Sequence, residues 1–120
     1  MDNHIHLIWQ MQSGNEPEAV QKDFLKYTAQ RIKKDLQKNH PAVLAHFKVN
    51  AKDRECQFWE RNGLSIELRT DEAFIQKLDY IHWNTVRAGL YNLPDEYKYS
   101  SALFYLTGID NWGFLTHYRD

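Results

Sequence analysis

Several features that mark secreted, membrane-spanning and disulfide-rich proteins are absent from this sequence of 120 residues. Its single cysteine, Cys56, can form neither an internal disulfide nor a cysteine-based zinc knuckle, which favours a reducing compartment. No apolar run reaches the roughly 18 residues of a membrane span. The apolar run after Met1 is too short for a secretory signal and carries two histidines. We therefore expect a cytoplasmic protein with no membrane partner.

An excess of either charge is absent as well. Fifteen Lys and Arg residues stand against sixteen Asp and Glu residues, for a formal net charge of −1. The overall charge therefore does not require a polyanionic partner, and any nucleic-acid surface must be a local patch. Apolar residues make up 42% of the chain and aromatic residues 14%, which is enough for a packed interior. This length suits one compact domain over residues 1–120.

The first ten residues have the pattern of a strand. In "NHIHLIWQ", residues 3–10, apolar and polar side chains alternate, which predicts a strand with Ile5, Leu7 and Trp9 on its core face. A second strand signal is Asn62-Gly63, which stands between two short runs in residues 56–69 and predicts a hairpin.

The rest of the chain is patterned mainly for helices. We expect helices over residues 17–38 and 71–88, a short helix near residues 43–47, and another beyond Pro94 that ends at Gly108. Asp71 is the expected N-cap of the helix over 71–88, and Gly89 is its expected C-terminal cap. Together with the strands, these helices predict an α+β fold.

His4 and His6 are the first candidates for chemistry. Residues two apart on a strand point the same way, so both imidazoles could bind one cation. The alternative is that two histidines alternate by chance on a half-exposed strand.

A polar stripe on the helix over residues 71–88 supplies possible partners for the histidines. Its members fall four, four and three residues apart, and they are Gln76, Tyr80, Asn84 and Arg87. Asn84 could add an oxygen ligand to a cation held by His4 and His6, and Tyr80 could present its phenol to a phosphate bound there. The alternative is that Tyr80 is an interfacial core aromatic and Asn84 an ordinary surface amide.

Three stretches of the sequence carry a family resemblance, and they are "MDNHIHLIW", "KLDYIHWNTVRAGL" and "PDEYKYSSALFY". In this order they resemble the REP-associated tyrosine transposases, a branch of the HUH single-strand DNA transposases, from Met1 to about Tyr105. The usual family forms are "MPNHxHLI" and "DYIHxNPVRAGL", so Asp2 and Thr85 stand where the family has proline. The resemblance implies a ferredoxin-like HUH domain, an antiparallel sheet with helices packed on it.

The resemblance also implies roles for the candidate residues. His4, His6 and Asn84 would hold Mg²⁺ or Mn²⁺, and Tyr80 would attack a phosphate of single-stranded or hairpin DNA, leaving a 5′-phosphotyrosine and a free 3′-hydroxyl. A phenol has an ordinary pKa of about 10 and is a weak nucleophile at neutral pH, so it needs the charge of the metal or a nearby base. Gln76 or His82 could assist it.

Basic residues are candidate contacts for DNA phosphates. Those that we select are Lys22, Lys26, Lys33, Lys34, Arg61, Arg69 and Arg87. The alternative is that the lysines form only a solvated helix face. Trp59 and Trp83 could stack on unpaired bases, or they could belong to the core.

The resemblance leaves rival interpretations open. Family members have several dozen residues before the HUH strand, so we expect the fold to be incomplete at its N-terminus, with an exposed strand edge. The chain could be a fragment, begin at a misplaced start codon, be a decayed remnant of a mobile element, or have a partner chain that fills the gap. A homodimer is a further expectation. The chain could then be an active transposase or an inactive remnant that only binds single-stranded DNA. A histidine-triad nucleotide hydrolase is disfavoured because Ile8 occupies the place of the third histidine.

Overall fold

The computed structural model of the chain describes residue 1, residues 3–60 and residues 63–120. By its contacts the chain divides into two compact units. One consists of Met1–Ile8 together with Ile66–Asp120, and the other is Trp9–Ser65. The expectation of one domain over residues 1–120 stays a prediction, and the two units are described in turn.

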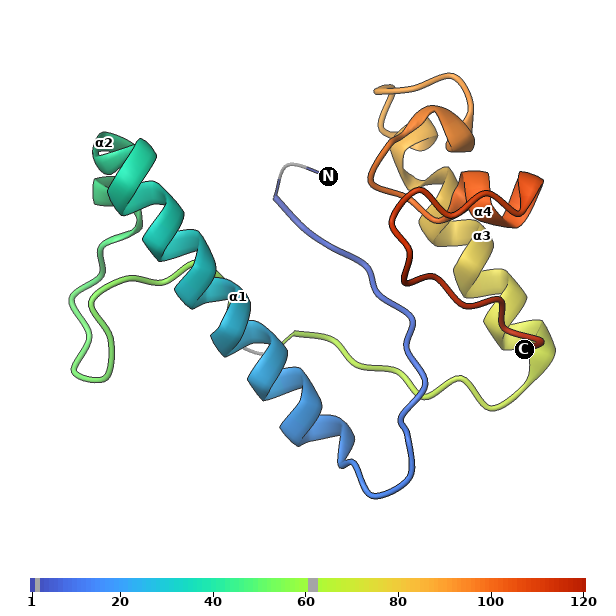
Figure 1. Cartoon of the computed structure of the whole chain (residues 1–120), viewed down its shortest axis with the longest axis horizontal. Helices are drawn as coiled ribbons and strands as arrows, with labels where there is room; N and C mark the ends of the chain where they lie inside the picture. The colour runs from blue at the N-terminus through green and yellow to red at the C-terminus, as the bar shows by residue number, and fades with distance from the viewer. Residues whose placement is uncertain (2, 61–62) are drawn as a thin grey trace. The chain divides into compact units, whose positions relative to one another are not determined.

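Helices make up the regular structure of the described residues (Figure 1). They are α1 (Pro17–Asn39), α2 (Pro41–Leu44), the 3-10 helix η1 (Ala45–Phe47), α3 (Asp71–Arg87), the 3-10 helix η2 (Pro94–Glu96) and α4 (Ala102–Thr107). The helices predicted over residues 17–38 and 71–88 are confirmed to within one residue at each end. Among the described residues, no helix has the length and apolar character that crossing a membrane requires.

The predicted antiparallel sheet is wrong, and with it the ferredoxin-like α+β fold. Neither residues 3–10 nor the described part of residues 56–69 forms a strand, and the pairing found in the described residues is an isolated bridge between Lys48 and Cys56. Ile5 and Leu7, expected in a core, are 51% and 48% exposed. A strand exists only through hydrogen bonds to a neighbour, so an alternating pattern makes no sheet where no second strand lies alongside. Asn62 of the predicted hairpin lies outside the described residues.

In the unit Trp9–Ser65, the chain turns back at the end of α1 and returns along it. Pro17 occupies the first turn of α1, and Pro41 begins α2, which packs against α1 and buries Leu44. Three contacts join this returning segment to α1. Glu55 pairs with Lys33 at 3.3 Å, the Trp59 indole donates to the Thr28 hydroxyl at 3.0 Å, and the Ser65 hydroxyl donates to Gln21 at 2.7 Å. Because the α1 partners descend in number, this segment runs antiparallel to α1.

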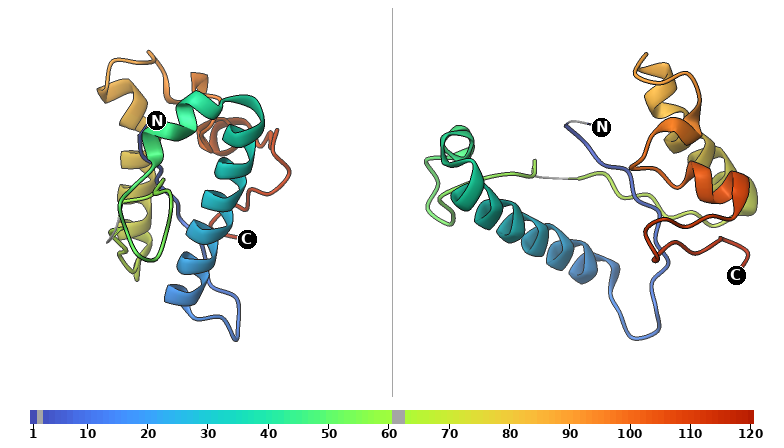
Figure 2. Two further views of the ribbon diagram at one scale, coloured as in Figure 1. Left: turned by 90° about the vertical axis from the view of Figure 1, so that its left-hand side faces the viewer. Right: turned by 45° about the horizontal axis from the view of Figure 1, so that its top comes forward.

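In the other unit, α3 is the central element and α4 lies beside it (Figure 2). The N-cap of α3 is Thr70, whose hydroxyl accepts from the Ala73 backbone N–H at 3.1 Å, so the prediction of Asp71 is wrong by one residue. Gly89 follows the helix at a φ of 75°, which favours glycine and confirms it as the terminating residue. Among the residues of this unit that the structure describes, His82, Thr85 and Ala102 are buried.

Candidate active site

The middle and end of α3 present three polar side chains in a row. Asn84 follows Tyr80 by four residues and Arg87 follows Asn84 by three, so all three lie on one side of a helix with 3.6 residues per turn. Tyr80 is 48% exposed, whereas His82 and Thr85 on the other side of α3 are buried. The helix is therefore anchored by one face and presents the phenol, the amide and the guanidinium on the other.

The N-terminal segment brings both predicted histidines to this row. His4 Nε2 lies 3.2 Å from Asn84 Oδ1, and His4 Nδ1 lies 2.7 Å from Asn3 Oδ1. The His4 and His6 rings are 5.1 Å apart between centroids, and the His6 ring meets the Tyr80 ring edge to face at 5.8 Å. The amide oxygens of Asn3 and Asn84 only accept, so a neutral His4 ring donates in one of these two contacts, and its tautomer decides which. The four residues selected as nucleophile and metal ligands thus gather in one place.

This donor set fits a small divalent cation. Two ligands at right angles on an octahedral ion, each about 2.1 Å from it, are about 3.0 Å apart, close to the His4–Asn84 separation of 3.2 Å. Among the described residues, no group of three or more His, Cys, Asp or Glu side chains could hold a metal ion, so a cation here would depend on the Asn84 amide as its third ligand. His4, His6 and Asn84 could therefore hold Mg²⁺ or Mn²⁺, with two imidazole nitrogens and one amide oxygen.

The surroundings of His6 favour its neutral form. Partial burial lowers the pKa of His6, and the nearby His4 ring and the N-terminal ammonium lower it further. A cation binds only the neutral imidazole, because protonation occupies the nitrogen lone pair. At neutral pH His6 is therefore available as a ligand.

Arg87 places a cationic side chain against Tyr80. Its guanidinium carbon lies 4.9 Å from the centroid of the Tyr80 ring, and Nη1 donates to the Tyr80 carbonyl oxygen at 3.1 Å. Residues seven apart are two turns apart on a helix, so Arg87 reaches back along α3 to this position. A phosphate at the Tyr80 hydroxyl would lie beside a permanent positive charge.

The two residues considered as helpers of Tyr80 lie in different surroundings. Gln76 is exposed, one turn before Tyr80 on α3. His82 follows Tyr80 by two residues, which turns it to the far side of the helix, where its Nε2 lies 2.8 Å from Ser101 Oγ and its ring packs 5.5 Å from the Tyr105 ring. Burial lowers the pKa of His82, although the carboxylate of Asp79 opposes this. The contacts of His82 thus join α3 to the start of α4.

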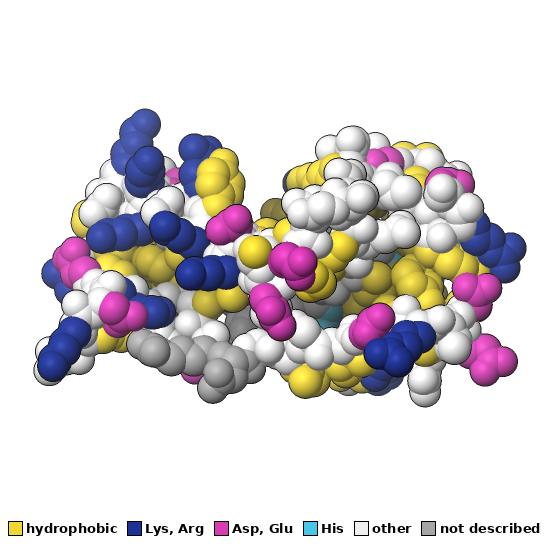
Figure 3. Space-filling view, turned by 90° about the horizontal axis from the view of Figure 1, so that it is seen from below, with side chains coloured by type: hydrophobic (Ala, Val, Ile, Leu, Met, Phe, Trp, Pro, Cys, Tyr) yellow, Lys and Arg dark blue, Asp and Glu magenta, His cyan; other side chains and the backbone are white. Residues whose placement is uncertain are grey.

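The basic residues selected as DNA contacts divide between the two units. Lys22, Lys26, Lys33 and Lys34 lie on α1, where Figure 3 shows Lys and Arg side chains together with Asp and Glu. Three of these lysines are exposed, and the ammonium of Lys33 pairs with Glu55 at 3.3 Å. Arg69, in the unit of Tyr80, pairs with Glu67 at 3.0 Å, and Arg61 lies outside the described residues. Of the described members of this group, Arg87 is the one placed against Tyr80.

Other residues of the site were not selected from the sequence. Asn3 contacts His4, and the N-terminal ammonium of Met1 donates to the Tyr97 hydroxyl at 2.7 Å, which fastens the segment that carries the histidines. Ser101 contacts His82. Asn3 and Ser101 lie inside the quoted motifs, so the motifs mark them without assigning a contact. Met1 and Tyr97 are 96 positions apart, so no local sequence pattern could predict their contact.

Comparison with known proteins identifies one relative. A curated protein of Haemophilus influenzae (strain ATCC 51907 / DSM 11121 / KW20 / Rd), named "Putative REP-associated tyrosine transposase", is 30% identical to this chain over 103 residues. The match covers 84% of this chain and 54% of the relative, so the chain spans about half the length of the curated relative that it matches. No family model matches the chain, and no solved structure matches it. This chain is therefore related to the REP-associated tyrosine transposases, as its motifs predict.

Proposed function

We propose that this chain cuts and rejoins single-stranded DNA at hairpin-forming repeats, with Tyr80 as the nucleophile. The observation that carries the proposal is the convergence of His4 and His6, from the N-terminal segment, with Tyr80 and Asn84 of α3. Each histidine is at least 74 positions from each of the two α3 residues, since His6 and Tyr80 differ by 74 positions and His4 and Asn84 by 80. Nothing in local structure requires them to meet.

The proposed reaction exchanges one phosphodiester for another. The Tyr80 phenol oxygen attacks the phosphorus, a bond from Tyr80 to the 5′-phosphate forms, and the bond to the 3′-oxygen breaks. The phenol loses its proton and the leaving 3′-oxygen gains one, so the cut ends are a 5′-phosphotyrosine and a 3′-hydroxyl. Attack by a 3′-hydroxyl on the phosphotyrosine reverses the step and rejoins the strand. No nucleotide cofactor is needed, because the number of phosphodiester bonds is conserved.

His4, His6 and Asn84 would hold Mg²⁺ or Mn²⁺ beside the phenol. When bound, the cation supplies positive charge next to the phosphate oxygens. The neutral state of His6, favoured by its lowered pKa, leaves this ligand ready at neutral pH. Arg87, 4.9 Å from the Tyr80 ring, would offset the negative charge that develops on the phosphate during attack.

The remaining basic residues would hold the DNA rather than act on it. Lys22, Lys26 and Lys34 are exposed on α1, and phosphate contacts from such residues release counterions, so binding would weaken as salt rises. Lys33 and Arg69 would first have to leave Glu55 and Glu67, and we assign them a smaller share. Arg61 is retained in the proposal on its sequence position alone.

The test is a covalent adduct. The full chain is incubated with Mn²⁺ and a labelled single-stranded oligonucleotide that carries a hairpin and flanking unpaired DNA, and the products are separated in denaturing gels. We expect an adduct whose label stays on the protein after denaturation. Tyr80→Phe should abolish it, whereas Tyr27→Phe, which removes a hydroxyl from a 62% exposed tyrosine on α1, should leave it unchanged.

Two results would count against the proposal. An adduct that persists in Tyr80→Phe would move the nucleophile to another residue. Binding of the oligonucleotide with no adduct, under conditions in which Mn²⁺ binds the protein, would favour the inactive single-strand DNA binder over the enzyme.

A further inference from the structure

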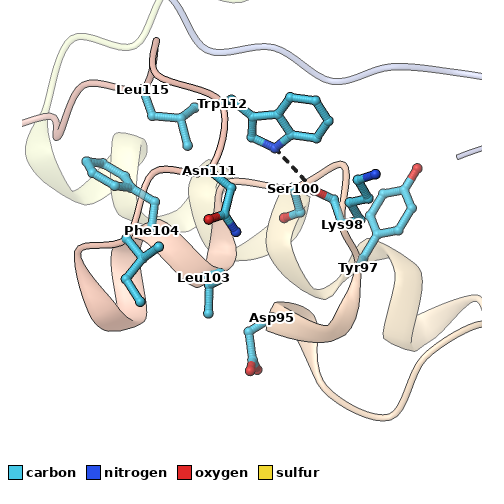
Figure 4. A pocket seen from close by; sticks show the side chains of 10 residues that line it. Asp95, Tyr97, Lys98, Ser100, Leu103, Phe104, Asn111, Trp112 and Leu115 are labelled. Carbon is cyan, nitrogen blue, oxygen red and sulfur yellow. Dashed lines mark hydrogen bonds between the residues drawn. The ribbon is translucent and has the colours of Figure 1, made fainter.

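The unit that contains α3 holds a pocket whose lining includes none of the residues gathered around Tyr80. It has a volume of about 280 Å³ and lies where η2, α4 and the loop after α4 meet (Figure 4). Its aromatic walls come from Tyr97, Phe104 and Trp112, and its polar lining includes Lys98 and Asn111. Aromatic walls with a few placed polar groups are typical of sites for small planar ligands.

The loop that carries Trp112 is held in place before any ligand binds. The Asp110 carboxylate accepts from the backbone N–H groups of Trp112, Gly113 and Leu115, at 2.8, 2.9 and 2.8 Å. Burial alone would raise the pKa of Asp110, but these N–H groups outweigh it and the pKa is lowered. The Trp112 indole N–H donates to the Lys98 carbonyl oxygen at 3.3 Å, drawn as the dashed line in Figure 4. A ligand would therefore meet a pre-formed wall.

Tyr99 and Phe114 lie beside Trp112 outside the lining of the pocket, and together with Lys98 we call them its rim. The Trp112 ring lies 5.7 Å from the Tyr99 ring and 6.4 Å from the Phe114 ring, and these two partners are 68% and 73% exposed. The Lys98 ammonium lies 5.6 Å from the centroid of the Tyr99 ring and 5.9 Å from that of the Trp112 ring. Proteins that bind single strands join stacking aromatics to cations that follow the phosphate backbone, and this rim has both.

We infer that this pocket binds one unpaired nucleotide of a single DNA strand, with the base stacked on Trp112 and the phosphate next to Lys98. The inference rests on the proposed function, because it names a further part of the same single-stranded substrate. Asn111, whose amide lies between Phe104 and Ser100 in Figure 4, can both donate to and accept from the edge of a base. The pocket would hold the strand by one base while Tyr80 acts on a phosphate elsewhere.

The first experiment observes the pocket directly. The four tryptophan indole N–H resonances are recorded by NMR, and Trp112→Phe identifies that of Trp112. We expect millimolar deoxyadenosine monophosphate to shift the Trp112 resonance while those of Trp9 and Trp59 stay in place. An unmoved Trp112 resonance with each of the four deoxynucleoside monophosphates would overturn the inference.

The second experiment measures the affinity of the full chain for an unpaired oligonucleotide. Because stacking of one base is worth about 1–3 kcal/mol, Trp112→Ala should raise Kd about fivefold or more. Lys98→Ala should raise Kd about threefold or more. Its matched control is Lys77→Ala, which removes an exposed lysine of α3 outside the pocket lining and should raise Kd less. Asn111→Ala keeps the test valid if Trp112→Ala fails to fold. Equal affinities of wild type, Lys98→Ala and Asn111→Ala would overturn the inference.

The adduct assay at saturating oligonucleotide separates the two proposals. If the wild type forms the Tyr80 adduct while the pocket variants bind as tightly as it does, the pocket inference fails and the proposed function stands. If no adduct forms while Trp112 responds to nucleotide and Trp112→Ala weakens binding, the cutting reaction fails and the pocket stands as a site of a DNA-binding protein.

Discussion

Replacing Ser101 with alanine tests whether His82 joins α3 to α4 as the structure indicates. His82 is 8% exposed, and its Nε2 lies 2.8 Å from Ser101 Oγ. Removing the hydroxyl leaves a buried ring nitrogen without this partner, so the free energy of unfolding should fall by about 1–3 kcal/mol. Urea unfolding followed by circular dichroism measures the change. In a His82→Phe background the hydroxyl has no imidazole to bind, and the same substitution should cost less than about 0.5 kcal/mol.

The same pair makes stability depend on pH. Burial lowers the pKa of His82 in the folded state, so below the ordinary histidine pKa of about 6.5 the unfolded chain takes up a proton before the folded chain does. The free energy of unfolding should therefore be constant above about pH 7 and fall below about pH 6.5. His6 acts in the same direction, so the contribution of His82 is the difference between wild type and His82→Phe. Parallel pH profiles of these two proteins would refute the reasoning.

Three further predictions concern the site and its support. Mn²⁺ at a hundred times its Kd should add about 2.7 kcal/mol to the free energy of unfolding, and His4→Ala should remove most of this; an equal gain in both proteins would place the ion elsewhere. Arg87→Ala should slow adduct formation at least about tenfold, whereas Arg69→Ala should change it little, as rapid-quench assays would reveal. Thr85 is 3% exposed, and its hydroxyl has no hydrogen-bond partner in the described part of the chain, so Thr85→Val should raise the free energy of unfolding by about 1 kcal/mol in the same urea assay.

Helices were predictable because their signals are local. Pro17, Pro41 and Gly89 mark helix boundaries through their own backbone preferences, and the structure has a helix boundary at each of them. The N-cap of α3 shows the limit of such signals. Thr70 and Asp71 are adjacent and both suit the position, and only the hydrogen bond to Ala73 distinguishes them.

The sheet was not predictable in the same way because a strand depends on a partner. The alternation in residues 3–10 is real, but it states only which side chains would share a face. In the described residues the segment pairs with no other, and Ile5 and Leu7 stay about half exposed. A single sequence carries no direct record of which distant segment lies alongside, so the inference from pattern to sheet was wrong.

The candidate site was more accessible to sequence reasoning than the fold. The spacing of Tyr80, Asn84 and Arg87 fixes their common face once α3 is recognised, and the His-Ile-His pattern places both imidazoles together in any extended chain. The spacing could not predict that the two histidines lie next to this face of α3. The fastening of Met1 to Tyr97 likewise had no local signal, whereas Arg87 lies against the Tyr80 ring within α3 itself, seven residues further along the helix.

The way in which the histidines are held has a consequence for cation binding. The segment of residues 3–8 is tied to its unit by the His4–Asn84 contact, the His6–Tyr80 ring contact and the Met1–Tyr97 hydrogen bond, while its apolar side chains Ile5 and Leu7 bury little. Fixing one residue of backbone costs about 1–2 kcal/mol, comparable to what one exposed hydrogen bond returns. Part of the binding free energy of a cation held by His4, His6 and Asn84 would therefore offset the cost of ordering this segment. Metal affinity would then depend on how ordered the N-terminal segment is.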